Sequence, residues 1–526
     1  MNHQTLIKHC FRKKILLNKS LFKDLSSQEL LQNCHHFPDS LLIINSDTFL
    51  FLEKETDWLE FDKQRFDLEK NHIQKMPSSL NDLNSASFLH SPSSLSPSSP
   101  HSSLSPISLY PLQIIESHQP QSKKYKVNDF TKIFAARYKF IENLLRNRQE
   151  LTGILSINKI LSKKERDNVS LIGMVSEINQ TKNNNLVITV EDFTGQIKIL
   201  INHNKPDLFS LAKDIVPDEI IGVIGANQND FVFADNIVWP DIPVQNELKK
   251  HTEEIYSIFL SDLHIGSTEF LAEEFNKFLD WLNQKTGNSN QKALAQKVKY
   301  IFIAGDIVEG VGIYPGQENE LTIKDIYQQF QTAADLLKKI PSHIQIILCP
   351  GNHEPLHLAE PQPAFNLKYT QSFTTLPNLT LVSNPALVNI AQAPGFPGFN
   401  VLLYHGYSFD YYVANVDSIR NQGGYHRADL IMKFLLKRRH LAPSFGSTPY
   451  YPSVEDALLI KTVPDFFITG HIHYSVAANY RGVTMICGSC WQAKTSFQEK
   501  LGHEPQPARV PLVNLKTREI KILKFI

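Results

Sequence analysis

Residue types that bind divalent metal ions recur at the ends of five apolar stretches in the second half of the chain. Each stretch has the Ile, Phe, Leu and Val content of a buried strand, and each is followed directly by Asp, Asn or His. The candidate ligands are Asp262, His264, Asp306, Asn352, His405, His471 and His473. A donor set of carboxylate, amide and imidazole without thiolate suits Mn²⁺, Fe²⁺, Zn²⁺ or Mg²⁺. A single histidine is more often a core residue, but five such motifs together favour a metal centre.

The elements that must position these residues alternate between apolar strands and helical stretches such as 273–281 and 323–339, which predicts an α/β unit. Open α/β sheets bind ligands beyond the carboxyl ends of their strands. Since residues i and i+2 share a face of an extended chain, we expect Asp262 to pair with His264, and His471 with His473. An Asp can bridge two ions, and two ions about 3.5–4 Å apart clamp a phosphoryl group.

The motifs SDLH, GD, GNHE, YHG and GHIH, in this order, resemble the calcineurin-like phosphoesterase superfamily. The resemblance implies a two-sheet sandwich flanked by helices and two divalent ions, with Mn²⁺ the first candidate. It implies one ion held by Asp262, His264, Asp306 and His473, and another held by Asp306, Asn352, His405 and His471. Asp306 would bridge the ions, a bridging hydroxide would attack, and His353 would contact the scissile phosphate and stabilise or protonate the leaving group.

Two further stretches, GGYHRADLIMKFLLKRRHLAPSFG and GSCWQAKTSFQEKLGHEPQPARVPLVNL, are similar to the small subunit of archaeal family D DNA polymerase. That resemblance implies a 3′–5′ proofreading exonuclease that acts on a DNA primer 3′ end beside a separate large catalytic subunit. The related eukaryotic B-subunits have lost their metal ligands, whereas this chain keeps them. Two alternatives stay open, a structural scaffold with an idle site and a free-standing metallophosphoesterase or repair nuclease.

Composition divides the chain into four parts, and so predicts a multidomain protein. Residues 1–75 are interpreted as a small, mainly helical domain and 76–125 as a flexible Ser/Pro-rich linker. Short β-like stretches in 126–248, with a hairpin turn at 192–195, predict a closed barrel of the OB-fold type. Few of its aromatic residues look exposed, which favours protein contacts over nucleic-acid binding. Residues 249–526 form the phosphoesterase.

Charge, cysteine content and hydropathy argue against a protein coated in positive charge, a disulfide-bonded protein and a membrane-spanning protein. Lys+Arg and Asp+Glu both number 53, so any contact with nucleic acid must be local. Five cysteines are too few for a disulfide framework, and no apolar run is long enough for a membrane span, which favours a cytoplasmic protein. Cys487 and Cys490 form a lone CxxC pair, which we interpret as buried small side chains rather than a zinc site.

Two further motifs bear on partners. The run Lys437, Arg438 and Arg439 predicts either contacts with the DNA backbone or a helix end that meets a partner subunit, and both interpretations stay open. Near the N-terminus, Gln4, Ile7 and Phe11 loosely match a sliding-clamp-binding peptide. Cys10 stands where an aromatic residue belongs in that motif, which favours a chance match.

Overall fold

The computed structural model describes residues 16–17, 43–44, 111–119, 124–452 and 455–526. The chain divides into two units, Met1–Ser103 and Leu104–Ile526. In the first unit, strands β1 (Leu16–Leu17) and β2 (Ile43–Ile44) pair in parallel. The remainder of the predicted helical domain, the Ser/Pro-rich stretch up to residue 110 and the clamp-like motif at Gln4, Ile7 and Phe11 lie outside the described residues.

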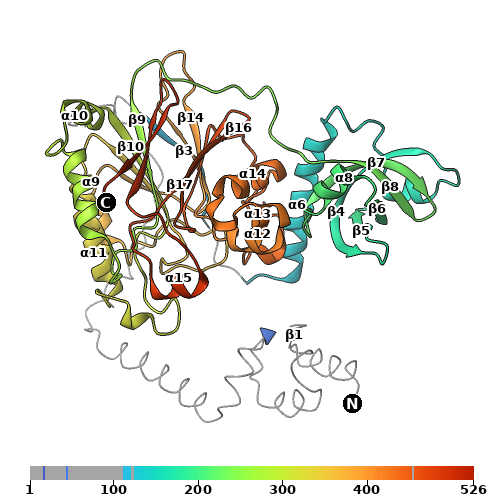
Figure 1. The fold of residues 1–526 in the computed structure, drawn as a ribbon, viewed down its shortest axis with the longest axis horizontal. Coiled ribbons are helices and arrows are strands. Elements are labelled where there is room, and N and C mark those ends of the chain that lie inside the picture. The colour runs from blue at the N-terminus through green and yellow to red at the C-terminus, as the bar shows by residue number, and fades with distance from the viewer. Residues whose placement is uncertain (1–15, 18–42, 45–110, 120–123, 453–454) are drawn as a thin grey trace, which may run out of the picture. The chain divides into compact units, whose positions relative to one another are not determined.

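Two six-stranded mixed sheets form the centre of the α/β part of the second unit (Figure 1). The order in the first sheet is β12 (Leu379–Leu381), β11 (Gln345–Cys349), β10 (Val298–Ala304), β9 (Tyr256–Leu260), β18 (Arg509–Asn514) and β19 (Ile520–Lys524). The order in the second is β16 (Ser475–Tyr480), β17 (Val483–Gly488), β15 (Phe466–Thr469), β14 (Phe399–Leu403), β13 (Ala386–Ile390) and β3 (Leu112–Ser117). Strands β9 to β12 are mutually parallel, as are β14, β15 and β17.

Three apolar layers hold the two sheets and their helices together. Side chains of both sheets, including Phe259, Phe302, Val401 and Phe466, share one buried core between the sheets. Helices α9 (Ala272–Leu282) and α11 (Ile326–Leu337) cover the outer face of the first sheet, and the short α10 (Ser289–Gln296) precedes β10. Helices α12 (Phe409–Asn415), α13 (Asp417–Asn421) and α14 (Ala428–Arg438) cover the second. Both faces are covered over the inner strands, which explains why strands such as β9, β11 and β15 are mainly apolar, whereas the edge strands β3, β16 and β19 are partly exposed.

A closed five-stranded barrel precedes this α/β part, as the short β-like stretches predicted. Its order is β4 (Asn168–Gln180), β5 (Leu186–Asp192), β6 (Gly195–Ile201), β8 (Phe231–Val238) and β7 (Ile220–Gln228), with helices α7 (Ile157–Leu161) and α8 (Pro206–Ala212). The hairpin turn predicted at 192–195 is confirmed, because Asp192 and Gly195 are paired across β5 and β6. The Asp192 carboxylate accepts hydrogen bonds from the Thr194 and Gly195 amides, which fixes the turn.

Strand β3 corrects the predicted linker over part of its length. Residues 112–117, which we expected inside the flexible stretch 76–125, pair with β13 at the edge of the second sheet. The Ser and Pro content upstream concealed an apolar segment, LQIIES, that supplies this edge strand. The His118 amide also donates to the Ser383 hydroxyl over 2.7 Å, so the segment is anchored at its end.

Helix α6 (Val127–Arg146) joins the barrel to the α/β part and contacts both (Figure 1). On the barrel side, the Tyr138 hydroxyl donates to the Ile172 carbonyl over 2.9 Å. On the other side, Arg137 forms an ion pair with Asp456 over 2.7 Å, with both side chains at most 2% exposed. Among the described residues, no helix has both the length and the apolar character that a membrane span requires.

Candidate metal centre

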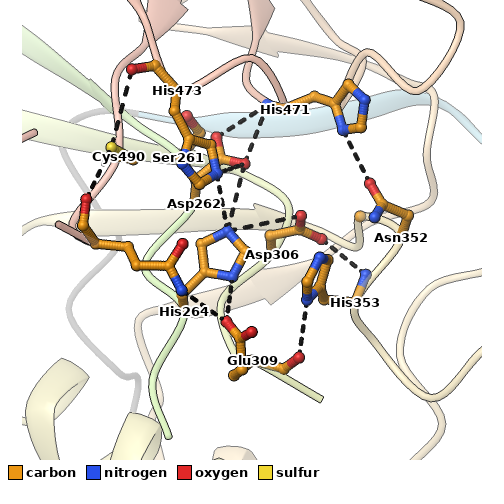
Figure 2. Close-up of polar contacts among 12 residues, drawn as sticks. Ser261, Asp262, His264, Asp306, Glu309, Asn352, His353, His471, His473 and Cys490 are labelled. Atoms are coloured by element: carbon orange, nitrogen blue, oxygen red, sulfur yellow. Dashed lines mark hydrogen bonds and ion pairs between the residues drawn. The ribbon is translucent and has the colours of Figure 1, made fainter. Parts of the chain in front are cut away.

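All seven predicted ligands come together where five strands end. Strands β9, β10 and β11 of the first sheet and β14 and β15 of the second direct their carboxyl ends to one place. Figure 2 shows the side chains that follow β9, β10, β11 and β15 converging. Three groups have ligand atoms within 4.8 Å of one another, and Asp306 belongs to two of them. These groups are Asp262, His264 and His473; His264, Asp306 and His353; and Asp306, His405 and His471.

The backbone at the ligands differs from the extended chain that we expected. Five of the seven ligands have φ values between 51° and 70°, in the left-handed region that non-glycine residues rarely adopt. They are Asp262, His264, Asp306, His471 and His473. Strand pairing ends before each of them, so alternation along a strand does not position these side chains. Each such residue costs roughly 1–3 kcal/mol of strain, which typically persists at functional sites.

Two glycines permit the close approach of the loops that carry the ligands. A Cβ atom on Gly351 would lie 2.3 Å from Oδ1 of Asp306, and one on Gly470 would lie 2.4 Å from Oδ2 of Asp262. Both distances are far shorter than van der Waals contact. At these two positions a side chain would take the space that the carboxylates occupy, so only glycine lets the loops approach this closely.

Ring nitrogens of the candidate ligands face carboxylate and amide oxygens at short distances, an arrangement that would suit a cation between them. Nδ1 of His405 donates to the Ala304 carbonyl over 2.8 Å, so Nε2 is the atom that faces the site. This Nε2 lies 2.9 Å from Oδ1 of Asn352 and 3.2 Å from Oδ2 of Asp306. The same Asn352 oxygen lies 3.0 Å from Nδ1 of His471. The ligand atoms thus fit a hard or borderline divalent ion at each side of Asp306.

The field of the buried carboxylates favours positive charge at this place. Burial alone would lower the pKa of His405, but Asp306 and Asp262 outweigh it and raise that pKa to about 10. Burial would raise the pKa of Asp306, yet His405 and His353 hold it well below its ordinary range. Asp306 therefore stays ionised at neutral pH, as a bridging ligand must.

Two buried glutamates that the sequence analysis missed hold the ligands in place. Oε2 of Glu309 lies 2.7 Å from Nδ1 of His264, which directs the other ring nitrogen of His264 toward the site. Glu354 accepts hydrogen bonds from the amides of Asp306, Ile307 and Gly351, at 3.1, 2.8 and 2.5 Å. Burial and the Asp306 charge raise the pKa of Glu354 to about 7. Glu354 is the last residue of the GNHE motif and Glu309 follows the GD motif by three residues, and this closeness to the motifs was the available signal.

Replacing Glu309 by Gln is expected to weaken Mn²⁺ binding by about 10- to 100-fold, because a neutral amide orients and polarises His264 less well than a carboxylate. Calorimetric titration with Mn²⁺ measures the effect. Glu318→Gln, an exposed position on the same loop, is the control and should bind like the wild type. Equal affinity in Glu309→Gln and wild type would contradict an orienting role.

His353 lies beside the ligands and is held by groups other than the proposed ions. Its Nδ1 lies 2.8 Å from the Glu309 carbonyl, and its amide donates to Oδ1 of Asp306 over 2.9 Å. Its ring meets that of His264 edge to face, with centroids 4.7 Å apart. Figure 2 shows the side chain on the same side of Asp306 as Glu309. Since Nδ1 is engaged by the backbone, Nε2 is the atom available to a substrate.

The basic run does not form a surface for the DNA backbone, and this prediction is corrected for its two arginines. Arg438 is 5% exposed and forms an ion pair with Glu219 of the barrel. Arg439 is 4% exposed and donates to the carbonyls of Ile460 and Lys461. Lys437 is half-buried, with its ammonium nitrogen 3.8 Å from the centre of the Trp239 ring. Lys437 and Arg438 therefore join α14 to the barrel, and Arg439 joins it to the segment at 460–461.

Cys487 and Cys490 are buried free thiols. Burial raises the pKa of Cys487 to about 12, and the thiol contacts the Gly470 carbonyl. Cys490 lies behind His473 and contacts its carbonyl oxygen (Figure 2). Among the described residues, neither thiol belongs to a group that could hold an ion, in agreement with buried small side chains.

Comparison with known proteins agrees with this organisation. The family of DNA polymerase alpha/epsilon B-subunits matches residues 257–477, a range that includes all seven predicted ligands and ends before the C-terminal strands of the first sheet. The family described as OB-fold nucleic acid binding domain matches residues 169–230, within the barrel. A solved archaeal phosphodiesterase covers 51% of this chain and 99% of its own, with a TM-score of 0.25 and 12% identity, a likeness too weak to carry an argument.

The similarity to curated proteins is much stronger. The DNA polymerase II small subunit of Methanothermobacter thermautotrophicus is 39% identical over 401 residues, covering 76% of this chain and 80% of that protein. That of Archaeoglobus fulgidus is 40% identical over 385 residues, covering 73% and 74%. Identity of this level over most of both chains shows that the chain belongs to the family of archaeal DNA polymerase II small subunits.

Proposed function

We propose that this chain is the exonuclease subunit of an archaeal replicative DNA polymerase and hydrolyses phosphodiester bonds at a primer 3′ end. The proposal is supported chiefly by the convergence of the other six candidate ligands around the ionised Asp306. A large catalytic subunit would be its partner and would carry out polymerisation. The names of the relatives support this partner, since a small subunit implies a larger one.

The residues divide into two roles. Asp262, His264 and His473 would hold one divalent ion, and Asn352, His405 and His471 the other, with Asp306 between them. Two such ions, Mn²⁺ foremost with Mg²⁺, Fe²⁺ or Zn²⁺ as alternatives, supply Lewis-acid activation of water and of the phosphate. His353, with Nε2 directed away from the Glu309 carbonyl, would hold a non-bridging phosphate oxygen and pass a proton to the departing 3′ oxygen.

An idle scaffold is the competing function, and two features of the structure speak against it. Five ligands keep a strained left-handed backbone, and three buried carboxylates, those of Asp262, Asp306 and Glu354, lie close together. Both features cost stability, and a scaffold gains nothing from either.

The His353→Ala variant is expected to degrade a mismatched primer about 10²- to 10⁴-fold more slowly than wild type while still binding Mn²⁺. The substrate carries one label at its 5′ end, which remains on the strand when nucleotides are removed from the 3′ end. The assay then measures the length of the labelled products formed in the presence of Mn²⁺. The chain is assayed alone and with its large subunit, and His343→Ala, on the surface before β11, is the control. Wild-type rates in His353→Ala would refute the role of this residue. Absence of metal-dependent shortening in wild type, alone and in the complex, would refute the exonuclease.

A further inference from the structure

A groove lined by aromatic side chains opens next to the metal centre. Its volume is about 410 Å³, and its described lining comprises Tyr407, Asp410, Tyr411 and the segment 445–449. Two of these residues contact a proposed ligand directly. Oδ2 of Asp410 lies 3.0 Å from Nε2 of His471, and the ring of Tyr407 lies 5.7 Å from that of His471. Whatever occupies the groove therefore lies beside His471 and the proposed metal centre.

The chemistry of the lining selects a flat, uncharged group. Three aromatic rings, those of Tyr407, Tyr411 and Phe445, border the groove, and Phe445 is 47% exposed. None of the described lining residues is a lysine or an arginine, and Asp410 is acidic. A phosphate in the groove would have no cation to pair with and would be repelled by the Asp410 carboxylate. A nucleobase, in contrast, can stack on the aromatic rings.

The far end of the groove leads toward the barrel. The Phe445 amide donates to the Asp218 carboxylate of the barrel over 2.9 Å, and the Phe445 ring packs against Phe130 and Phe134 of α6. A single strand that leaves the metal centre along this groove would therefore reach the face where α6 and the barrel meet. The groove thus connects the metal centre to the part of the chain that matches a nucleic-acid-binding barrel.

We propose that this groove binds an unpaired nucleobase of the DNA strand whose phosphate lies at the metal centre, stacked on Tyr411 and Tyr407. The inference rests on the proposed exonuclease function and extends it to the substrate, because only an unpaired end can place a base there. A paired end must first melt, and a mismatch lowers the cost of melting. The groove would thereby favour mismatched over matched ends.

The test measures stacking directly. A single-stranded oligonucleotide carries 2-aminopurine at one of its last three positions and phosphorothioate linkages that block hydrolysis, and it is mixed with the full chain and Mn²⁺. Binding to wild type is expected to quench the fluorescence at one of these positions. Tyr411→Ala should lose the quenching and bind about tenfold more weakly, whereas Tyr411→Phe and the exposed Tyr327→Ala should behave like wild type.

A second experiment distinguishes the loss of base stacking from a general loss of DNA affinity. An oligonucleotide that lacks the base at the quenched position should bind wild type about tenfold more weakly than the intact oligonucleotide. It should bind Tyr411→Ala with almost the same affinity as the intact oligonucleotide does, because removing the base and removing the Tyr411 ring eliminate the same contact. Additive losses, or unchanged quenching in Tyr411→Ala, would overturn the proposal while leaving metal-dependent shortening, and hence the proposed function, intact. Reduced co-purification of Tyr411→Ala with the large subunit, with DNA binding unchanged, would also overturn it and assign the groove to a peptide.

Discussion

An asparagine in place of Asp306 is expected to lower the rate of 3′ shortening by at least about a thousandfold, which makes Asp306→Asn the most damaging single change in the site. Asp306 lies between the two proposed ion positions, with Oδ2 3.2 Å from Nε2 of His405 and 3.9 Å from Nε2 of His264. The amide keeps the shape of the side chain and can still accept the His353 amide hydrogen bond. It removes the charge that attracts both ions, and several kcal/mol of transition-state stabilisation with it.

Metal binding provides a readout that does not depend on catalysis. Mn²⁺ should raise the melting temperature of wild type, since an ion that binds only the folded state stabilises it by linkage. Asp306→Asn should show little or no such increase, while the exposed Asp335→Asn should match wild type in both melting temperature and rate. A variant that keeps the wild-type rate and the wild-type metal response would exclude Asp306 as a bridging ligand.

The convergence of the seven candidate ligands was predictable because each follows an apolar strand at the point where strand pairing stops. The stretch KYIFIAGD shows this for Asp306, since β10 ends at Ala304, two residues earlier. What the sequence could not reveal is how the backbone turns there. The pairs Asp262/His264 and His471/His473 look like alternating positions of a strand, but left-handed backbone directs His471 and His473 to different ligand groups.

The sequence analysis missed Glu309 and Glu354, which hold the candidate ligands in place, because their role depends on distances between loops. Glu354 is the last residue of the GNHE motif, but the motif does not tell which backbone amides the side chain will meet. In the structure it is 2% exposed and accepts amide hydrogen bonds from two different loops. The basic run at 437–439 illustrates the reverse error. Its composition fits a surface that binds DNA, but the carboxylate that pairs with Arg438 is Glu219, which belongs to a different domain.

These outcomes share one physical cause. Strand ends and their ligands follow from local hydrophobic pattern, which a single sequence displays. The partner of a buried charge is set by tertiary packing, and local sequence carries little information about it. Edge strand β3 is another example, because its pairing with β13 is not evident from the Ser/Pro-rich composition around it.

Removal of Arg137 is expected to destabilise the chain by about 3–5 kcal/mol, the largest effect on stability that we predict. Arg137 is 1% exposed, pairs with Asp456 over 2.7 Å and donates to the Pro443 carbonyl over 2.8 Å. The Arg137→Met variant keeps much of the apolar stem but leaves Asp456 as a buried carboxylate whose remaining partners are His440 and the Leu458 amide. Since Arg137 lies on α6, the loss should loosen the attachment of α6 and the barrel to the α/β part. Urea denaturation of the two proteins measures the difference.

The pH dependence tests the electrostatic origin of this loss. Burial would raise the pKa of Asp456, but Arg137 and His440 outweigh it and hold that pKa well below its ordinary range. A carboxylate whose pKa is lowered by folding stabilises the native state at pH values above the ordinary aspartate pKa of about 3.9. This stabilisation is lost as the pH falls from that value toward the lowered pKa of the native state. In Arg137→Met the pKa of Asp456 should rise, so the carboxyl group can take up a proton and the deficit should shrink from about pH 7 toward about pH 4.

Two matched variants decide between charge and packing as the cause. Arg146→Met removes an exposed arginine of the same helix, whose pair with Glu142 spans one turn, and should cost less than about 0.5 kcal/mol. Adding Asp456→Asn to Arg137→Met should recover part of the lost stability, because it removes the unpaired charge. If the double variant is as unstable as the sum of the single ones, lost packing around Phe134 and Tyr450, over which the guanidinium lies, accounts for the effect instead.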